Sequence, residues 1–469
     1  MLTLNCFYDI ITANGEMQVN IVIIGQGKVG STLTEYLIKE SHDITVIDIN
    51  AKTIENITNS FDVMGFVGNG ASYNVQTEAG VNKANLVIAS TPSDEVNILC
   101  CLLAKKIGAK HTIARVRNPE YANQLYFLRS DLGLSMVVNP ELDAATEIFK
   151  IISFPSALKL DAFSRGRVEL AEIKIDAESE LDGQVLSQLY KKYNLKILVC
   201  VVERGDDVYI PGGDFVLNSG DKIYITASHA ALSQFFKTLG IYQHKLKKVM
   251  IVGGGRIGYY LGGLLSSSAI DVKIIEQDEK RCLELSELLP KCTVICGDGT
   301  DQIVLNEEGL NESDAIVSLT GIDEENMVIS MYAQHRGIKK VITKINRQSF
   351  VGMLSTVGLD SIISPKIISA NRVLGYTRAM ANSESSSLKT MYKLVDGRVE
   401  AIEFEISESS QVIGIPLRDL RIKKGILIGC IIRKGQIIFP GGNDTIEKYD
   451  SVIVITKNKG LSEITDIIS

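Results

Sequence analysis

Residues 25–30 read Gly-Gln-Gly-Lys-Val-Gly and directly follow the apolar run from Val19 to Ile24. The same glycine spacing recurs at residues 253–258, Gly-Gly-Gly-Arg-Ile-Gly, after the apolar run from Val249 to Val252. Such a stretch is typical of a tight turn from a buried parallel strand into a helix whose N-terminal amides face a phosphate. One glycine motif of this kind is a weak signal, but two copies in the same local context are a strong one.

An acidic residue closes the apolar run that follows each glycine motif, Asp48 in the first copy and Glu276 in the second. A carboxylate at this position accepts hydrogen bonds from the adenosine ribose hydroxyls. It also repels a 2′-phosphate, so the sequence predicts NAD rather than NADP at both sites. The alternative is a Rossmann-like unit whose glycines serve only the tight turn and whose pocket stays empty.

The composition is that of an ordinary globular protein. The chain has 469 residues, 45% of them hydrophobic and 22% charged, no Trp and a formal net charge of −7. This length suits about three or four domains. A mildly acidic chain without a basic stripe argues against nucleic-acid binding, and no stretch reaches the roughly 18 to 20 apolar residues of a membrane-spanning helix. Residues 1–17 are predicted to be an N-terminal extension without the basic region of a secretory signal, and Met17 is an equally sensible start.

The eight cysteines form no CxxC pair and no zinc-type spacing. Most of them lie inside apolar runs, which predicts small, buried and reduced residues. The alternative is a redox pair formed by Cys292 and Cys296.

The two halves of the chain correspond well beyond the glycine motifs. The matching segments are residues 68–71 with 297–300, 85–91 with 314–320, 94–97 with 323–326, and 114–116 with 343–345. In each copy, strand-length apolar runs alternate with helical patterns, which predicts a parallel sheet covered on both faces. A shorter β-rich repeat follows each copy, with Pro-Gly-Gly turns at 211–213 and 440–442. One helical piece is predicted near Leu186 to Tyr193 and its partner near Leu417 to Ile422.

The sequence therefore predicts an α/β fold of two tandem Rossmann-like, doubly wound parallel-sheet domains, each followed by a small α+β domain. The expected parts are an extension at 1–17, a first Rossmann domain at 18–140, a crossover helix and linker at 141–163, a first small domain at 164–239, a second Rossmann domain at 246–365, a crossover helix and linker at 366–387, and a second small domain at 388–469. Residues 144–152 have helical apolar spacing, and we expect that helix to pack on a neighbour.

With this order, residues 19–468 resemble the TrkA family, the peripheral subunits of Trk potassium-uptake systems. In that family, each of two tandem regulator-of-potassium-conductance (RCK) units has a Rossmann-like N-terminal domain and a smaller C-terminal domain. The most specific shared parts are the paired glycine motifs with Asp48 and Glu276, the Gly-Asp-Gly-Thr at 297–300 and the two Pro-Gly-Gly turns.

The resemblance implies a gating assembly that is not an enzyme. It would be a homotetramer, cytoplasmic and peripheral on the inner face of the cell membrane, attached to a potassium-translocating membrane subunit of the TrkH/TrkG type. Binding of NAD(H), ATP or ADP would change the shape of the ring, and that change would be transmitted to the pore.

The resemblance also implies the residues of two nucleotide pockets. In the first they are Gly25, Gln26, Gly27, Lys28, Val29, Gly30, Asp48, Asn69, Gly70, Thr91, Pro92 and Arg115, and in the second Gly253, Gly254, Gly255, Arg256, Ile257, Gly258, Glu276, Asp298, Gly299, Thr320, Gly321 and Lys344. Asn69 stands where the second copy has Asp298, and Arg115 where it has Lys344. Because Lys lacks the planar fork that grips two phosphate oxygens, we expect two unequal sensors.

An NAD-dependent oxidoreductase is the main alternative, because its glycine motif is the same; an NAD-binding regulator of some other transporter is a further one. Hydride chemistry would need an acid or base near the nicotinamide. No repeated position offers one, and the five histidines fall at unmatched places in the two halves. They are interpreted as surface or turn residues, and neither a catalytic residue nor a metal site is predicted.

Overall fold

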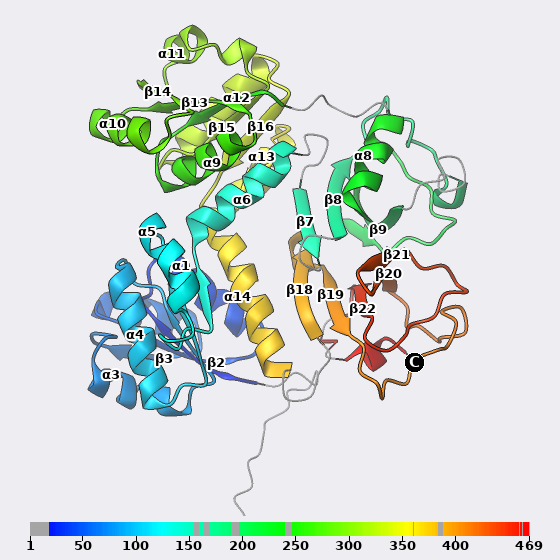
Figure 1. Ribbon diagram of the computed structural model, residues 1–469, viewed down its shortest axis with the longest axis horizontal. Coiled ribbons are helices and arrows are strands. Elements are labelled where there is room, and N and C mark those ends of the chain that lie inside the picture. The colour runs from blue at the N-terminus through cyan, green and yellow to red at the C-terminus, as the bar shows by residue number, and fades with distance from the viewer. Residues whose placement is uncertain are drawn as a thin grey trace, which may run out of the picture. The chain divides into compact units, whose positions relative to one another are not determined.

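The computed structural model describes residues 18–153, 159–163, 168–188, 197–239, 246–359, 361–382, 388–458, 460–461 and 463–468 (Figure 1). The chain divides into two compact units, residues 1–143 with 365–384, and residues 144–364 with 385–469. The predicted extension at 1–17 lies outside the described residues. In the described part of the chain, no helix is long and apolar enough to cross a membrane.

The first unit is built on a six-stranded sheet of order β3-β2-β1-β4-β5-β6, whose strands pair in parallel. Its strands are β1 (Asn20–Ile24), β2 (Asp43–Asp48), β3 (Met64–Val67), β4 (Leu86–Ala89), β5 (His111–Arg115) and β6 (Met136–Val138). Its helices are α1 (Lys28–Ile38), α2 (Ala51–Ser60), α3 (Tyr73–Glu78), α4 (Asp94–Ile107) and α5 (Pro119–Leu128). The strand order reverses between β1 and β4, and at such a switch point the diverging connections leave a crevice at the carboxyl ends of the strands.

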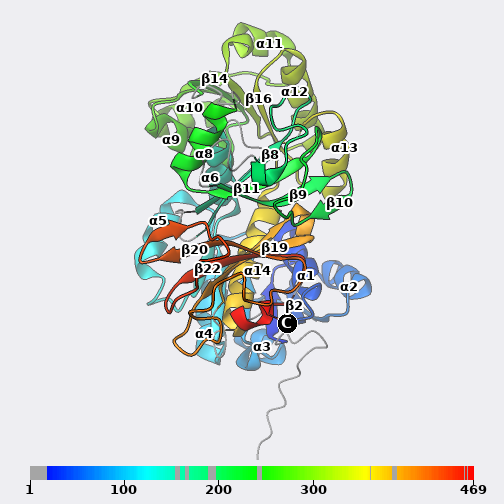
Figure 2. The same ribbon diagram turned by 90° about the vertical axis from the view of Figure 1, so that its right-hand side faces the viewer.

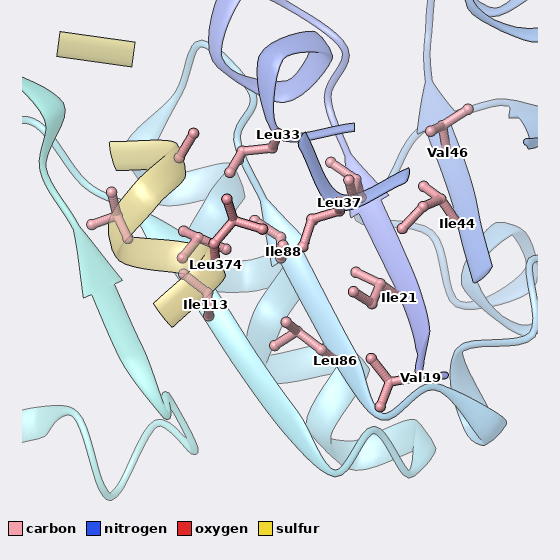
Figure 3. Packing of buried hydrophobic residues seen from close by; sticks show 14 of the residues in the cluster. Val19, Ile21, Leu33, Leu37, Ile44, Val46, Leu86, Ile88, Ile113 and Leu374 are labelled. Atoms are coloured by element: carbon pink, nitrogen blue, oxygen red, sulfur yellow. The ribbon is translucent and has the colours of Figure 1, made fainter. Parts of the chain in front are cut away.

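Helix α14 (Pro365–Asn382) completes the first unit, although in the chain it follows the second parallel sheet. Leu374 of α14 joins the core that contains Leu33 and Leu37 of α1, and Figure 3 shows it near Ile88 and Ile113 of the sheet. Polar contacts extend this packing, because Arg378 pairs with Glu40, and the Tyr376 hydroxyl lies 2.9 Å from His111 Nδ1.

The second unit repeats the parallel sheet in the order β14-β13-β12-β15-β16-β17. Its strands are β12 (Lys248–Val252), β13 (Asp271–Glu276), β14 (Thr293–Cys296), β15 (Ala315–Ser318), β16 (Lys340–Lys344) and β17 (Ile362–Ile363). Its helices are α9 (Arg256–Ser267), α10 (Glu279–Leu288), α11 (Gln302–Glu307), α12 (Asp323–His335) and α13 (Val351–Thr356).

The helix predicted at 144–152 is confirmed as part of α6 (Pro140–Ser153), whose residues from 144 onward belong to the second unit. It begins earlier than predicted because Asn139 caps it, its Oδ1 accepting from Leu142 N at 3.0 Å, and because proline suits a first helical position. Its apolar residues Ala144, Ala145, Ile148, Ile151 and Ile152 are buried.

Two five-stranded antiparallel sheets form the rest of the second unit (Figure 2). One has the order β10-β9-β11-β8-β7, with β7 (Lys159–Phe163), β8 (Val168–Lys174), β9 (Ile197–Arg204), β10 (Asp207–Tyr209) and β11 (Lys222–Ala227), and α8 (His229–Thr238) follows it. The other has the order β18-β19-β22-β20-β21, with β18 (Leu388–Leu394), β19 (Val399–Glu405), β20 (Ile426–Arg433), β21 (Gln436–Ile438) and β22 (Ser451–Thr456). Strand β7 lies within the stretch predicted as crossover helix and linker.

The two small sheets share one hydrophobic core. Cys200 and Val201 of β9 lie in the same buried cluster as Ala401 of β19 and Cys430 of β20. At its margin Arg398 donates to Glu203 Oε1 at 2.6 Å. The two small sheets therefore pack directly on one another within the second unit.

Each small sheet contains the same ion pair between an arginine and a buried aspartate. Arg204 donates from Nε and from one terminal nitrogen to the two oxygens of Asp221, both at 2.8 Å, and Arg433 contacts Asp450 in the corresponding place. The carboxylates are 0% and 1% exposed. Asp450 also accepts from Glu447 N at 2.7 Å, so each pair fastens a strand to the turn beside it.

The predicted helical piece at Leu417–Ile422 is wrong. Leu417 N and Arg418 N donate to Asp444 O and Gly442 O, both at 2.9 Å, so the segment begins by bonding to the second Pro-Gly-Gly turn and the loop after it. Only a single turn follows, in which Asp419 N donates to Pro416 O at 2.8 Å. In the first copy residues 186–188 are helical, and residues 189–193 lie outside the described residues.

Candidate functional site

Each glycine motif forms a turn that passes directly against the neighbouring strand end. Gly25 has φ +89°, and a Cβ there would lie 2.7 Å from Thr91 N; Gly253 has φ +107° and would meet Leu319 C at 2.8 Å. A left-handed backbone packed this closely requires glycine. The last glycine of each motif lets the helix approach the turn, since a Cβ on Gly30 would lie 1.9 Å from Gly25 O.

The middle glycine of each motif differs, because space is open around it. No described atom lies within 4 Å of a Cβ built on Gly27 or on Gly255. These two residues are also the N-caps of α1 and α9, and no described side chain caps either helix. By contrast, Asn50, Ser93 and Asp278 cap α2, α4 and α10 with their side chains. Uncapped first-turn amides beside open space fit an anion such as a pyrophosphate.

The acidic residue at the end of the second strand holds each glycine turn in place. Asp48 accepts from Gln26 N at 2.7 Å and from Asn50 N at 2.9 Å. Glu276 accepts from Gly254 N at 2.7 Å and from Asp278 N at 3.0 Å. Each carboxylate is half-buried and uses one oxygen for each bond, so lone pairs remain for ribose hydroxyls.

The loop after the third strand adds the other side of each crevice. Asn69 Oδ1 accepts from Ala71 N at 2.9 Å, and Asp298 Oδ1 accepts from Thr300 N at 2.9 Å. The hydrogen bonds from Thr300 hold the pKa of Asp298 below its ordinary value. The following glycines pack on the first strand, because a Cβ on Gly70 would lie 2.1 Å from Ile24 and one on Gly299 2.2 Å from Val252.

Sequence reasoning missed a pair of buried asparagines that join two strand ends in each sheet. The Asn97 amide accepts from Thr91 N at 2.7 Å and donates to Thr91 O and Arg115 O at 3.1 and 2.9 Å. Asn326 makes the same three bonds to Thr320 and Lys344. Both asparagines are 0% exposed. The match of residues 94–97 with 323–326 was the available signal, but it does not show that each amide bonds to two different strand ends, six and eighteen residues away.

Three residues before each of these asparagines, an aspartate holds the loop that follows β5 or β16. Asp94 accepts from Arg117 N and Asn118 N at 2.8 and 2.7 Å, and Asp323 accepts from Asn346 N and Arg347 N at 3.0 and 2.9 Å. Burial acts to raise the pKa of Asp323, but the hydrogen bonds from these amides outweigh it and the pKa is lowered. Both aspartates therefore serve as acceptors for backbone amides.

The predicted cationic residues at the two crevices lie at the ends of β5 and β16. Arg115 is half-buried. Lys344 bends back onto its own sheet, where Nζ donates to Thr320 O and Leu319 O. Thr91 and Thr320 each bond to the carbonyl two residues on, with Pro92 in the first crevice and Gly321 in the second as the intervening residue.

The second crevice contains a guanidinium that the sequence did not single out. Arg281 Nε donates to Gly254 O at 2.9 Å, beside Glu276. Thr53 occupies the corresponding place in α2. A side chain at Gly254 would clash with Leu285 at 2.4 Å, whereas Gln26 of the first turn fits in a buried position and contacts Thr34 at 3.1 Å. The two crevices therefore differ here as well as at Arg115 and Lys344, in line with the expectation of unequal sites.

The histidines of the first unit lie at the opposite end of the sheet from the crevice. His111 begins β5, and His42 directly precedes β2. The prediction of a surface or turn residue is wrong for His42, which is only 9% exposed, and burial lowers its pKa to about 4. Among the described residues, no group of three or more His, Cys, Asp or Glu side chains is placed to hold a metal ion.

Two switch-point crevices, each with a glycine turn, an uncapped helix and a carboxylate, define a tandem Rossmann-type protein with a dinucleotide-binding architecture. The predicted fold class is confirmed. The TrkA-N domain model matches residues 21–140 and 249–365, and the TrkA-C domain model matches residues 170–240 and 401–469. The chain therefore belongs to the TrkA family, and the resemblance found in the sequence is confirmed.

Curated relatives and solved structures agree with this assignment. The chain is 32% identical over 449 residues to a Trk system potassium uptake protein TrkA homolog of Archaeoglobus fulgidus, covering 96% of this chain and 100% of the relative. It is 30% identical to the Trk system potassium uptake protein TrkA of Halomonas elongata, covering 94% and 96%. The fold is shared with the GsuK RCK domain, with TM-score 0.63, 18% identity and coverage of 96% and 95%.

Proposed function

We propose that this protein is a cytoplasmic, nucleotide-binding regulatory subunit, peripheral on the inner face of the cell membrane, that gates a Trk-type potassium-uptake channel or transporter. Its partner is a potassium-translocating subunit of the TrkH/TrkG type, and it acts as a homotetramer. The observation that carries the proposal is the repeated crevice, in which uncapped amides of α1 and α9 adjoin open space at Gly27 and Gly255. The names of the curated relatives supply the transport system.

The ligand in this proposal is NAD(H), with ATP or ADP at the same sites. Residues 25–30 and 253–258 hold the phosphates, and Asp48 and Glu276 bind the ribose. Two structures of the same fold support these ligands: a GsuK channel bound to NAD, with TM-score 0.63 and 17% identity over 96% of this chain and 79% of that chain, and GsuK bound to ADP, with TM-score 0.50 and 16% identity over 78% and 69%.

The same geometry favours sensing over hydride chemistry. Around the crevices, Asp94 and Asp323 accept backbone amides, and Lys344 donates to strand-end carbonyls. These contacts position loops, and they leave these three side chains engaged with backbone. The NAD-dependent oxidoreductase is the alternative, and steady consumption of NADH with a small carbonyl or hydroxy-acid substrate would favour it.

A route for gating begins at the phosphate end of α1. Its N-terminus faces the first crevice, and Leu33 and Leu37 pack on α14, which precedes the second small sheet in the chain. A ligand shifts a conformational equilibrium only by its differential affinity for the two states. A nucleotide that moves α1 therefore has a direct contact through which to bias α14. We also propose the domain bounds expected from the sequence, with Rossmann domains at 18–140 and 246–365 and small domains at 164–239 and 388–469.

The test is co-purification of the protein with a Trk-type membrane subunit, followed by potassium flux at varied NADH, ATP and ADP. We expect a stable complex whose flux depends on nucleotide. A complex whose flux is the same with and without every nucleotide would contradict gating, and the absence of any complex would contradict the partner.

A further inference from the structure

Two thiols meet at the edge of the second crevice. Cys282 lies on α10 and is buried, whereas Cys296, the last residue of β14, is exposed. Cys282 Sγ lies 3.2 Å from Glu276 O and 4.0 Å from Ile295 O, so it sits over the ends of β13 and β14. Cys296 is the register partner of Glu276 across those two strands, and the two thiols are close enough for Cys296 to raise the pKa of Cys282.

The first crevice has no such pair of thiols at the corresponding positions. The pair also differs from Cys292 and Cys296, which the sequence suggested. The corresponding residues of α2 and β3 are Ile54 and Val67. Cys292, the other candidate partner of Cys296, instead has its Sγ 3.5 Å from Gly262 O on α9. The neighbour of Cys296 is thus Cys282, which is fourteen positions away in the chain and was not paired with it by spacing.

We propose that Cys282 and Cys296 form a reversible disulfide beside the second crevice when the protein meets a small disulfide such as oxidised glutathione. The exposed Cys296 thiolate attacks one sulfur of that disulfide, which releases one small thiol and leaves a mixed disulfide on Cys296. Cys282 then loses its proton to solvent and attacks Cys296 Sγ, which releases the second small thiol. Two protein thiols are oxidised, and one small disulfide is reduced to two thiols.

The surroundings of the two sulfur atoms set their order of reaction. Burial, followed by the interaction with the neighbouring Cys296 thiol, raises the pKa of Cys282 to about 11. Since the thiolate is the nucleophile, the exposed Cys296 reacts first with an external disulfide. Cys282 is then the resolving thiol, and it needs to reach only the neighbouring sulfur.

The bond would tie α10 to the end of β14, on either side of Glu276. The Glu276 carbonyl is the present acceptor of the Cys282 thiol, and residues 297–299 follow Cys296 directly. Cross-linking therefore moves the carboxylate and the loop assigned to the adenosine end of the nucleotide. This consequence rests on the proposed function, and we expect affinity at the second crevice to fall about fivefold, as for one lost hydrogen bond.

The first experiment treats the full-length protein with oxidised glutathione, blocks the remaining thiols and maps tryptic peptides by mass. Lys291 separates Cys282 from Cys296, so trypsin releases them on different peptides. We expect these peptides to be linked and lighter by two hydrogens. The link should survive in Cys292→Ser, which shows which cysteine of the second peptide takes part, and it should be lost in Cys282→Ser, where Cys296 keeps a glutathione adduct. A wild-type Cys296 that stays unmodified or keeps only the adduct would overturn the proposal.

The second experiment measures nucleotide binding by calorimetry in an Asp48→Asn background, which weakens the first crevice, before and after cross-linking. Weaker binding that recovers on adding a reducing thiol is expected. Unchanged affinity in fully cross-linked protein would refute the effect on the pocket. Absence of binding in the reduced protein would refute the proposed function instead, while the cross-link is judged by mass alone.

Discussion

At the residue scale, the three glycines of each turn have separate physical reasons. Gly25 and Gly30 are glycines because the chain folds tightly on itself, whereas Gly27 has open space where a side chain would go. Where the fold itself does not require glycine, the absence of a side chain suggests that a ligand approaches the backbone closely. The same distinction separates Gly255 from Gly253 and Gly258.

Gly27→Ala is therefore expected to preserve the fold and to weaken nucleotide binding at the first crevice by tenfold or more, because a methyl group would stand where phosphate approaches the helix amides. Gly30→Ala is the matched comparison and should unfold the first unit or prevent expression, since its Cβ would lie 1.9 Å from Gly25 O. Calorimetry with NADH and thermal unfolding distinguish the two variants. Equal binding by Gly27→Ala and the wild type would argue against a phosphate at this turn.

Asp48→Asn should weaken NADH and ATP binding by about 1 to 3 kcal/mol, because it removes a charged acceptor of the ribose hydroxyls. Asp43→Asn provides a control on the same strand, since Asp43 lies at the opposite end of β2 and contacts Gln18. Titration calorimetry of both variants measures the difference. If Asp43→Asn and Asp48→Asn bind alike, the role assigned to Asp48 is incorrect.

The lowered pKa of His42 should make the free energy of unfolding of the first unit depend on pH. It lies near Glu40 and Arg378, and burial lowers its pKa to about 4 from an ordinary value of 6.5. The unfolded chain therefore binds the additional proton between these two pH values. The contribution to the free energy of unfolding is complete above about pH 6.5 and is lost as the pH falls toward 4, by up to about 3 kcal/mol.

Urea unfolding of the wild type and of His42→Leu, at pH 7.5 and pH 5, measures this term. We expect the wild type to lose more stability than the variant on acidification, while the lowered pKa of His111 affects both chains. An identical loss in the two chains would show that His42 is not the group that titrates.

At the element scale, the parts of the fold that the sequence could predict are those encoded locally. The glycine turns, the alternation of strands and helices, and the helix at 144–152 follow from short-range patterns. The segment at 417–422 was misassigned because its backbone bonds to a loop more than twenty residues away. Asn97, Asn326 and Arg281 were missed because their role lies in bonds to backbone groups that no spacing rule identifies.

The repeated Arg–Asp pair gives a prediction at this scale. Asp450→Asn should lower the free energy of unfolding of the second small domain by about 2 to 4 kcal/mol, because it leaves the Arg433 charge without its buried partner. Lys448→Ala, which removes an exposed pair with Glu408, should change stability by less than about 0.5 kcal/mol. Denaturant unfolding compares the two variants. A small effect of Asp450→Asn would mean that the pair does not hold the strand to its turn.

At the scale of the whole molecule, the chain is more than two independent halves in series. Helix α14 follows the second Rossmann domain but completes the first unit, and the two small sheets share a core. The sequence indicated the repeat, yet it could not indicate this exchange, because the contacts of Leu374 with the first sheet join residues more than 250 positions apart. In the proposed function, a nucleotide that moves α1 at the first crevice would act directly on α14, which packs on α1.

The most direct measurement of the central claim is potassium flux through a Trk-type membrane subunit reconstituted with this protein, with and without NADH, ATP and ADP. The wild type should make flux depend on nucleotide, and a variant carrying both Gly27→Ala and Gly255→Ala should bind the membrane subunit and give flux that no nucleotide alters. Flux that responds equally in the wild type and in this variant, or that responds in neither, would contradict the account.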